Sequence, residues 1–326
     1  MARGIAPSDI TTTGVQTNGI GLKVAVEGDG PLVILVHGWP ELWYSWRHQI
    51  PALAAASYRV VAPDVRGYGG SDKPRSVEAY DMRTLTADLV GLLDAFGEER
   101  AVLVGHDWGA PICWNTAVLH PERVRAVAGL SVPFSPRPPV SPIQLYQTLY
   151  AGRFFYQLYF QQEGVAEAEL EADVRTALRK VYFSVSGDAG TPALGEDKPP
   201  SAGLLDGLVD PDPFPAWLSD TDLDYYVGAF EQGGFRGPIN RYRCQHRDWE
   251  DLPELADARI RQPSFFIAGS RDPVRHFIPE MDLYAEPGAY CSDFRGQVII
   301  EGKGHWIQQE APARVTQALL GFLRGL

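Results

Sequence analysis

The segment Gly105–Gly109 reads Gly-His-Asp-Trp-Gly and lies where a short apolar run gives way to a helical pattern. It fits the G-x-S-x-G pattern of a nucleophile elbow, with Asp107 in place of the serine. Glycines suit such a bend, because the backbone is strained and the neighbouring chain passes too closely for a Cβ atom. An aspartate nucleophile can displace at an sp³ carbon, by opening an epoxide or expelling a halide, and leaves an alkyl ester for water to hydrolyse. The alternative is an ordinary turn with a helix-capping aspartate.

Two further residues could complete this chemistry. Asp272 follows the apolar run Phe265–Ala268, and His305 follows the run Val298–Glu301. This gives the chain order nucleophile, acid, histidine that accompanies elbows of this kind. Asp272 would hold the tautomer of His305 and stabilise its imidazolium, while His305 would deprotonate the attacking water. An aspartate before a proline is commonly a turn residue, but the joint placement at three strand ends favours a triad.

The backbone near the elbow offers two donors for an oxyanion. The N–H of Trp108 opens the helix after Asp107, where the helix dipole favours negative charge. The N–H of Trp39, in the segment His37–Pro40 (His-Gly-Trp-Pro), follows another buried run and is the expected second donor. The bond between Trp39 and Pro40 is a candidate for the cis form. The alternative for this segment is a buried histidine with a turn-forming proline.

Other polar motifs are interpreted as structural. The loop Asp64–Ser71 contains glycines for a turn, and its Asp64 and Arg66 are expected to make loop hydrogen bonds or a charge pair. His106 is interpreted as a packing residue beside the nucleophile. No histidine stands in a metal-binding pattern such as H-E-x-x-H, so neither a metal nor a cofactor is expected.

The elements that must position these residues alternate along the chain. Short apolar runs predict strands, and helical patterns between them predict helices. Strand and helix in strict turn imply an α/β fold with a mostly parallel central sheet flanked by helices on both faces. The predicted elements are strands Ile20–Val26, Leu32–Val36, Tyr58–Ala62, Ala101–Gly105 and Val124–Leu130, and helices Trp46–Ala55, Thr84–Phe96, Gly109–Leu119 and Pro312–Leu323.

This alternation fails in the middle of the chain. Residues 133–251 are rich in proline, aromatic residues and acidic helix-like patches, and Ser186–Pro215 is predicted to be a loop. The pattern of strands resumes at Ser264–Ala268. We therefore expect a core domain of residues 1–132 and 252–326, split by an inserted, mainly helical lid of residues 133–251.

The composition narrows the class of protein. The chain has 326 residues, of which 45% are apolar, and a formal net charge of −12. This charge would repel nucleic acid and anionic membrane surfaces. Three dispersed cysteines without a CxxC pair predict neither a disulfide framework nor a zinc site, as in a reducing compartment. No apolar leader opens the chain, and no window approaches the roughly 18 to 20 apolar residues that cross a bilayer. A cytoplasmic protein is expected.

The motifs together resemble the α/β-hydrolase-fold epoxide hydrolases. The stretches HGWP, RGYGGS, GHDWG, GSRDPV and GKGHW occur in the order of that family, and the resemblance extends from about Asn18 to Leu323, including the lid. It implies an α/β-hydrolase fold, with a small-molecule epoxide and water as the reactants. It also implies that Asp107, Asp272 and His305 form the triad.

The resemblance extends to lid residues. Two lid tyrosines of that family donate to the epoxide oxygen as the ring opens, and the segments Phe154–Gln161 and Gly234–Arg243 match theirs. The resemblance therefore assigns this role to Tyr156 and Tyr242, and it places Phe154 in the substrate pocket. This role agrees with the chemistry, because an alkoxide is a poor leaving group and needs a proton donor. A phenol with a pKa near 10 stays protonated at neutral pH and can donate to the oxygen.

Two departures from the family lie beside these lid motifs. The family usually has Trp where Arg241 stands and Pro where Glu163 stands, so the shape of the pocket stays open. The physiological epoxide, the carbon attacked, the enantiopreference and whether two copies pair as a homodimer also stay open.

Two other classes of protein compete with this hypothesis. Haloalkane dehalogenases share the aspartate nucleophile and the following Trp, but they typically have Asn where Trp39 stands and lack the paired lid tyrosines. Fluoroacetate dehalogenases share an HGxP-like turn. A hydrolase-fold receptor would bind a small ligand without turnover and could lose a triad member, yet all three are present.

Overall fold

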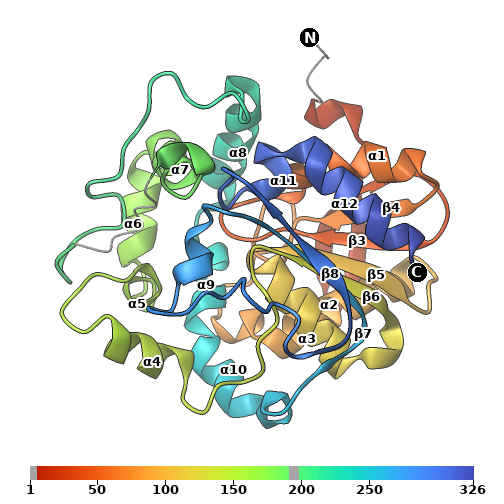
Figure 1. Ribbon diagram of the computed structural model, residues 1–326. Helices are drawn as coiled ribbons and strands as arrows, with labels where there is room; N and C mark the ends of the chain where they lie inside the picture. The colour runs from red at the N-terminus through yellow and green to blue at the C-terminus, as the bar shows by residue number, and fades with distance from the viewer. Residues whose placement is uncertain (1–5, 191–197) are drawn as a thin grey trace.

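Every strand in residues 6–190 and 198–326, the ranges that the computed structural model describes, belongs to one sheet (Figure 1). The spatial order is β1-β2-β4-β3-β5-β6-β7-β8. The pairs β1/β2 and β2/β4 are antiparallel, and every pair from β4 to β8 is parallel. The strands are β1 (Thr12–Thr17), β2 (Ile20–Glu27), β3 (Leu32–Val36), β4 (Arg59–Pro63), β5 (Ala101–His106), β6 (Val124–Leu130), β7 (Ile260–Gly269) and β8 (Cys291–Ile300). The mostly parallel sheet expected from the sequence is confirmed.

Helices cover both faces of the sheet. Helices α1, α11 and α12 lie on one face, and α2 and α3 lie on the other (Figure 1). The chain between β6 and β7 contains α4 to α10, of which α4 to α9 are grouped to one side of the sheet (Figure 1). The α-helices are α1 (Gln49–Ala55), α2 (Met82–Ala95), α3 (Gly109–Leu119), α4 (Pro142–Leu149), α5 (Tyr156–Tyr159), α6 (Val165–Ala172), α7 (Val174–Ser184), α8 (Asp220–Gly233), α9 (Arg236–Arg243), α10 (Gln245–Asp251), α11 (Ile307–Glu310) and α12 (Pro312–Arg324).

Strand β3 is apolar at every position because helices cover both of its faces. Leu32 and Ile34 pack in a cluster with residues of α2 and α3, whereas Val33 and Leu35 pack in a cluster with residues of α1 and α12. Successive side chains of a strand point to opposite faces, so a strand covered on both faces is apolar at every position. The same packing fixes the carboxyl end of β3, which leads directly into the segment His37–Pro40.

Most predicted elements lie within two residues of the observed ones. The strand predicted from Ser264 begins at Ile260, and the helix predicted from Trp46 begins at Gln49. The two edge strands differ for a common reason. Strand β1 was not predicted, because its side chains are mostly exposed and polar. Strand β8 is longer than its apolar end, Val298–Ile300, because its first residues lie partly exposed at the other edge of the sheet. A hydrophobic pattern detects buried strands, so it misses the exposed edges of this sheet.

The stretch Ser186–Pro215 was predicted to be a loop. Its described residues contain one short 3-10 helix, Gly187–Ala189, and otherwise turns and bends, while residues 191–197 lie outside the described ranges. Among the helices of the described chain, none is long and apolar enough to cross a bilayer.

Candidate active site

Asp107 lies at the bend between β5 and α3, as the motif Gly105–Gly109 predicts. Its backbone φ is 49°, in the left-handed region that residues other than glycine seldom adopt. The bend is crowded, because a Cβ atom on Gly109 would lie 2.1 Å from the carbonyl oxygen of Val36, and one on Gly38 would lie 2.3 Å from Oδ1 of Asp107. Glycines at these two positions therefore let strand β3 approach the bend and hold the aspartate at the carboxyl end of the sheet.

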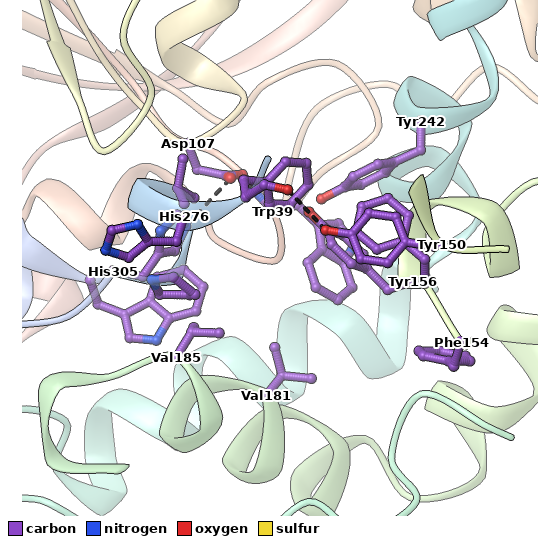
Figure 2. Close-up of a pocket in the computed structure, with 15 residues that line it drawn as sticks. Trp39, Asp107, Tyr150, Phe154, Tyr156, Val181, Val185, Tyr242, His276 and His305 are labelled. Atoms are coloured by element: carbon purple, nitrogen blue, oxygen red, sulfur yellow. Dashed lines mark hydrogen bonds and ion pairs between the residues drawn. The ribbon is translucent and has the colours of Figure 1, made fainter. Parts of the chain in front are cut away.

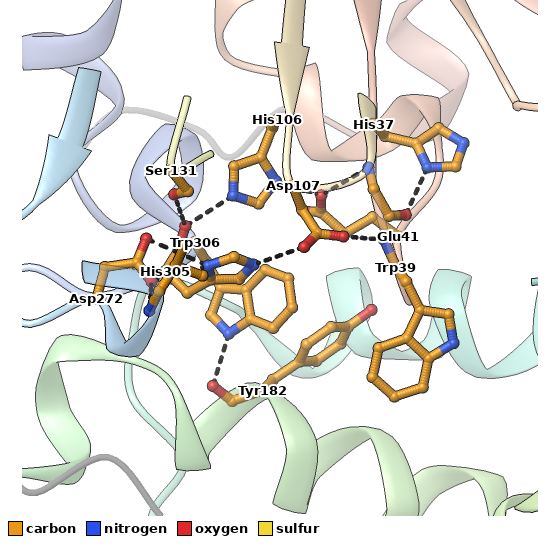
Figure 3. A network of polar contacts seen from close by, with 12 residues as sticks. His37, Trp39, Glu41, His106, Asp107, Ser131, Tyr182, Asp272, His305 and Trp306 are labelled. Carbon is orange, nitrogen blue, oxygen red and sulfur yellow. Dashed lines mark hydrogen bonds and ion pairs between the residues drawn. The ribbon is translucent and has the colours of Figure 1, made fainter. Parts of the chain in front are cut away.

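The Asp107 carboxylate contacts groups from two other segments (Figure 3). The backbone N–H of Trp39 donates to Oδ1 at 2.7 Å, and Nε2 of His305 lies 3.4 Å from Oδ2. Burial alone would raise the pKa of Asp107, but the hydrogen bond and charge of His305 outweigh burial and lower this pKa. Trp108 is the N-cap residue of α3, and the bond between Trp39 and Pro40 is cis. The N–H of Trp39, one of the two predicted oxyanion donors, thus points at the predicted nucleophile, and Trp108, the other, caps the adjacent helix.

His305 contacts a second carboxylate through its other ring nitrogen. Its Nδ1 atom lies 3.1 and 3.2 Å from the two oxygens of Asp272, which also accepts the N–H of Val274 at 3.0 Å. Burial alone would lower the pKa of His305, but Asp272 and Asp107 raise it well above its ordinary value. Burial would likewise raise the pKa of Asp272, and the charge of His305 outweighs it and lowers this pKa. The three predicted residues therefore form one chain of contacts with the histidine in the middle.

A cavity lies beside Asp107 and His305 (Figure 2). Tyr156 on α5 and Tyr242 on α9 line it across from these two residues, and Phe154, just before α5, lines it as well. The cavity wall is otherwise mostly apolar or aromatic, and includes Phe155, Val181, Val185, Val274, Phe277 and Trp306. The structure thus brings the tyrosines and the phenylalanine predicted from the lid motifs into the same cavity as Asp107.

The two phenols that face the cavity have different neighbours. The amide of Gln157 donates to the Tyr156 oxygen at 2.9 Å, whereas the ring of Tyr242 lies edge-on to the indole of Trp108, with the centroids 5.3 Å apart. Burial raises the pKa of Tyr156 and that of Tyr242 well above the ordinary value, so both phenols keep their hydrogen. Each phenol can therefore donate this hydrogen to a ligand in the cavity.

A buried polar network behind the triad was not predicted. Nδ1 of His106 lies 2.7 Å from Oε2 of Glu41, and Nε2 lies 2.8 Å from the carbonyl oxygen of His305 (Figure 3). The other oxygen of Glu41 accepts from the amides of Gln308 and Gln309 at 2.9 and 3.0 Å. His106 packs beside the triad residues as predicted, with its ring centroid 4.8 Å from that of His305, but the hydrogen bonds of both of its nitrogens were not predicted. The available signal was the position of these polar residues directly beside the motifs HGWP and GKGHW.

The carboxylate of Glu310 accepts hydrogen bonds from the segment that contains His305. One of its oxygens accepts the backbone N–H groups of Gly187 and Gly304 at 2.9 and 3.0 Å, and the other accepts the N–H of Trp306 at 3.1 Å. Gly187 belongs to the stretch between β6 and β7, whereas the other two residues flank the histidine. A single buried carboxylate therefore joins that stretch to the histidine segment.

The loop Asp64–Ser71 makes structural contacts, as predicted. Asp64 accepts two backbone N–H groups at 3.0 and 2.9 Å. Arg66 pairs with Asp88 at 2.7 Å rather than with Asp64. Across residues 6–190 and 198–326, no three His, Cys, Asp or Glu side chains gather in a way that could hold a metal ion.

The two departures from the family pattern differ in their surroundings. Glu163 pairs with Arg236 at 2.6 Å, and their side chains are 55% and 38% exposed. Arg241 is buried, and its guanidinium lies against the ring of Trp108. Only the second departure therefore contacts a residue next to Asp107.

Comparison with family models identifies the class of protein. Residues 31–312 match the model of the α/β hydrolase fold. The sheet order, the elbow between β5 and α3 and the order of Asp107, Asp272 and His305 agree with this match. The chain has an α/β-hydrolase fold, as the sequence predicted.

Curated relatives and solved structures define the family more narrowly. The chain is 51% identical to epoxide hydrolase A of Mycobacterium tuberculosis over 316 residues, covering 96% of this chain and 97% of that protein. It is 40% identical to epoxide hydrolase 2 of Siraitia grosvenorii, covering 97% and 98% of the two chains. The solved structure of epoxide hydrolase A from Mycobacterium thermoresistibile matches with a TM-score of 0.90 at 46% identity, covering 97% of this chain and 99% of that chain. The chain belongs to the epoxide hydrolases of the α/β-hydrolase fold.

Proposed function

We propose that this chain converts an epoxide and water into a vicinal diol through a covalent ester on Asp107. The observation that carries the proposal is the cavity in which Asp107 faces the phenols of Tyr156 and Tyr242. A carboxylate suits displacement at an sp³ carbon, and a phenol suits donation to the oxygen that leaves that carbon. The activity named for the relatives supports the same substrate class.

In the first step, an oxygen of Asp107 attacks one ring carbon of the epoxide. The ester C–O bond forms as the ring C–O bond breaks, and the electron pair of the broken bond goes to the ring oxygen. Tyr156 and Tyr242 donate hydrogen bonds to this oxygen, and one of them gives it a proton. Such general-acid help is worth roughly 10² to 10⁴ in rate. The raised pKa of both phenols keeps the proton available at neutral pH.

In the second step, water hydrolyses the ester. His305 takes a proton from the water, and the water oxygen bonds to the carbonyl carbon of Asp107. The N–H groups of Trp39 and Trp108 stabilise the oxyanion that forms. The bond between this carbon and the alkyl oxygen then breaks, and the diol leaves with the proton from His305. Asp107 returns to a carboxylate as its remaining proton passes to the tyrosinate.

The charge around His305 changes between these steps. In the free site, Asp272 and Asp107 both raise the pKa of His305. Formation of the ester makes Asp107 neutral and removes one of these two anions, so the pKa of His305 falls. The histidine therefore becomes a better base once an ester exists for water to attack.

We assign residues 133–251 to a lid and residues 1–132 and 252–326 to the core. In this division the lid supplies Tyr156, Tyr242 and much of the apolar wall, and the core supplies the triad. The apolar and aromatic lining suits apolar or aromatic epoxides. The mechanism uses neither a metal nor a cofactor.

Dehalogenation by the same nucleophile is the rival activity. A halide leaves carbon without taking a proton, so it would not need the two phenols that face Asp107. We therefore expect turnover of styrene oxide and no halide release from 1-chlorobutane.

The substitution His305→Gln tests the proposal, because it removes the base for the second step and keeps Asp107 and the phenols. With styrene oxide, the variant should gain the mass of one substrate molecule on the Asp107 peptide, and diol release should fall by roughly 10³ or more. The control His246→Gln, on α10 outside the cavity lining, should turn over without accumulating the ester. Continued diol release from His305→Gln with no trapped ester would contradict the proposal.

A further inference from the structure

Arg241 is a buried cation directly before Tyr242 on α9. Its side chain is 5% exposed, its guanidinium donates to the carbonyl oxygen of Tyr80 at 2.5 Å, and it forms an ion pair with Asp248. A buried charge is tolerated only where it is paired and hydrogen-bonded, and removal of its partners is strongly unfavourable. The partners of Arg241 therefore fix where this part of α9 can lie.

These partners connect α9 to the core. Tyr80 lies just before α2, and Asp248 on α10 accepts the N–H of Met82, the first residue of α2, at 2.8 Å. One arginine and one aspartate thus join α9 and α10 to the start of α2. Because Tyr242 is the next residue on α9, this connection sets its position relative to the sheet.

Arg241 also contacts the residue after the nucleophile. Its guanidinium carbon lies 4.8 Å from the ring centroid of Trp108. The ring of Tyr242 lies 5.3 Å from the same indole, centroid to centroid, at an interplanar angle of 88°. The position of the indole, and with it the packing of Tyr242 against it, therefore depends on Arg241.

The charge of Arg241 also lies close to Tyr242. Both side chains contact the indole of Trp108 in a buried region, where charges are weakly screened. A phenol that gives up its proton becomes negative, and a neighbouring guanidinium stabilises that negative charge.

We propose that Arg241 is a positioning residue for epoxide opening, which holds Tyr242 and Trp108 beside Asp107 and favours proton donation by Tyr242. The inference rests on the proposed function. It concerns the first step, because Tyr242 assists ring opening whereas His305 assists hydrolysis of the ester. A residue that only stabilised the fold would not distinguish between these steps.

Rapid-quench experiments with styrene oxide, read by the mass of the intact protein, measure ester formation and ester hydrolysis separately. Arg241→Met should slow ester formation by about 10-fold to 100-fold, as expected when a proton donor is misplaced, and change hydrolysis by less than about threefold. Arg241→Lys keeps the charge but lacks the planar fork, so it should restore part of the lost rate. Recovery with Lys would exclude a purely apolar role.

Arg243→Met is the matched control. Arg243 lies on the same helix, its side chain is 4% exposed, and it pairs with Glu167 at 2.7 Å. The control should lose a comparable amount of thermal stability, while its rate of ester formation stays within about threefold of the unaltered protein.

Two results would overturn the role of Arg241. These are an unchanged rate of ester formation in folded Arg241→Met, or equal slowing of both steps. If Arg241→Met does not fold, Asp248→Asn weakens the same connection while keeping the contact with Trp108, and no loss of ester formation in that variant would also overturn the role. Failure of the unaltered protein to form any ester would instead overturn the proposed function, and this inference with it.

Discussion

The Nε2 atom of His305 lies 3.4 Å from Oδ2 of Asp107, on the side of the ring opposite the contact with Asp272. A water molecule that attacks an ester on Asp107 would therefore lie within reach of a nitrogen whose basicity the second carboxylate supports. This relationship ties the second step of the proposed mechanism to one pair of atoms, and several predictions depend on it.

The rate of ester hydrolysis should depend on pH in one direction. His305 is a base only when neutral, and Asp272 still raises its pKa after Asp107 has become neutral. Below that pKa the imidazole is protonated, so the rate constant should fall about tenfold per pH unit, and above it the rate constant should level off. Rapid-quench measurements from about pH 5 to pH 9 check this dependence. A hydrolysis rate constant that does not change with pH would contradict the role of His305.

The rate constant of ester formation should not fall at low pH in the way that the rate constant of ester hydrolysis does. The lowered pKa of Asp107 keeps the nucleophile ionised, and the raised pKa of Tyr156 and of Tyr242 keeps both donors protonated. The two Tyr→Phe variants should each slow ester formation by about tenfold, and the double variant by roughly 10³. Circular dichroism checks that the fold is intact. Undiminished ester formation in the folded double variant would refute the lid assignment.

Asp272→Asn should lower the pKa of His305, because it removes a buried anion that raises this pKa. Ester hydrolysis should slow by roughly 10³ or more, since the base loses the group that stabilises its imidazolium. NMR titration of the His305 ring measures the change in pKa. An unchanged ring pKa would contradict this prediction, because it would mean that the charge of Asp272 does not stabilise the imidazolium of His305.

Glu41→Gln tests the network that the sequence did not predict. The variant replaces one oxygen of Glu41 by an NH₂ group. This group would face either His106 or the amides of Gln308 and Gln309, and the hydrogen bond at that oxygen would be lost. Loss of a buried hydrogen bond should lower the free energy of unfolding by about 1 to 3 kcal/mol. Denaturant unfolding measures this change, with the partly exposed Glu98→Gln as the control. Equal stability of both variants would mean that the network tolerates the change without cost.

The grouping of Asp107, Asp272 and His305 could be predicted from sequence because each of them follows an apolar strand within a short motif. Asp107, Asp272 and His305 follow β5, β7 and β8, which run parallel in one sheet, so the alternation of strand and helix already places them at one edge of the sheet. The aromatic residues Tyr156 and Tyr242 carry no such pattern of their own. They could be singled out only through the resemblance to a known family.

Contacts between distant segments could not be predicted in the same way. Glu41 and His106 are far apart in sequence, and each alone is an ordinary polar residue until the fold buries both. Arg241 was noticed as a departure, but its partner Asp248 depends on how α9 and α10 pack against α2. The cytoplasmic location and the homodimer stay predictions.

A single turnover in ¹⁸O water measures the central claim most directly. With the enzyme in excess over styrene oxide, the account predicts that the diol contains no solvent oxygen and that the peptide bearing Asp107 gains one ¹⁸O atom, because water attacks the ester at the carboxyl carbon. A labelled diol from that first turnover, together with an unlabelled Asp107 peptide, would mean that water opens the epoxide directly and would contradict the account.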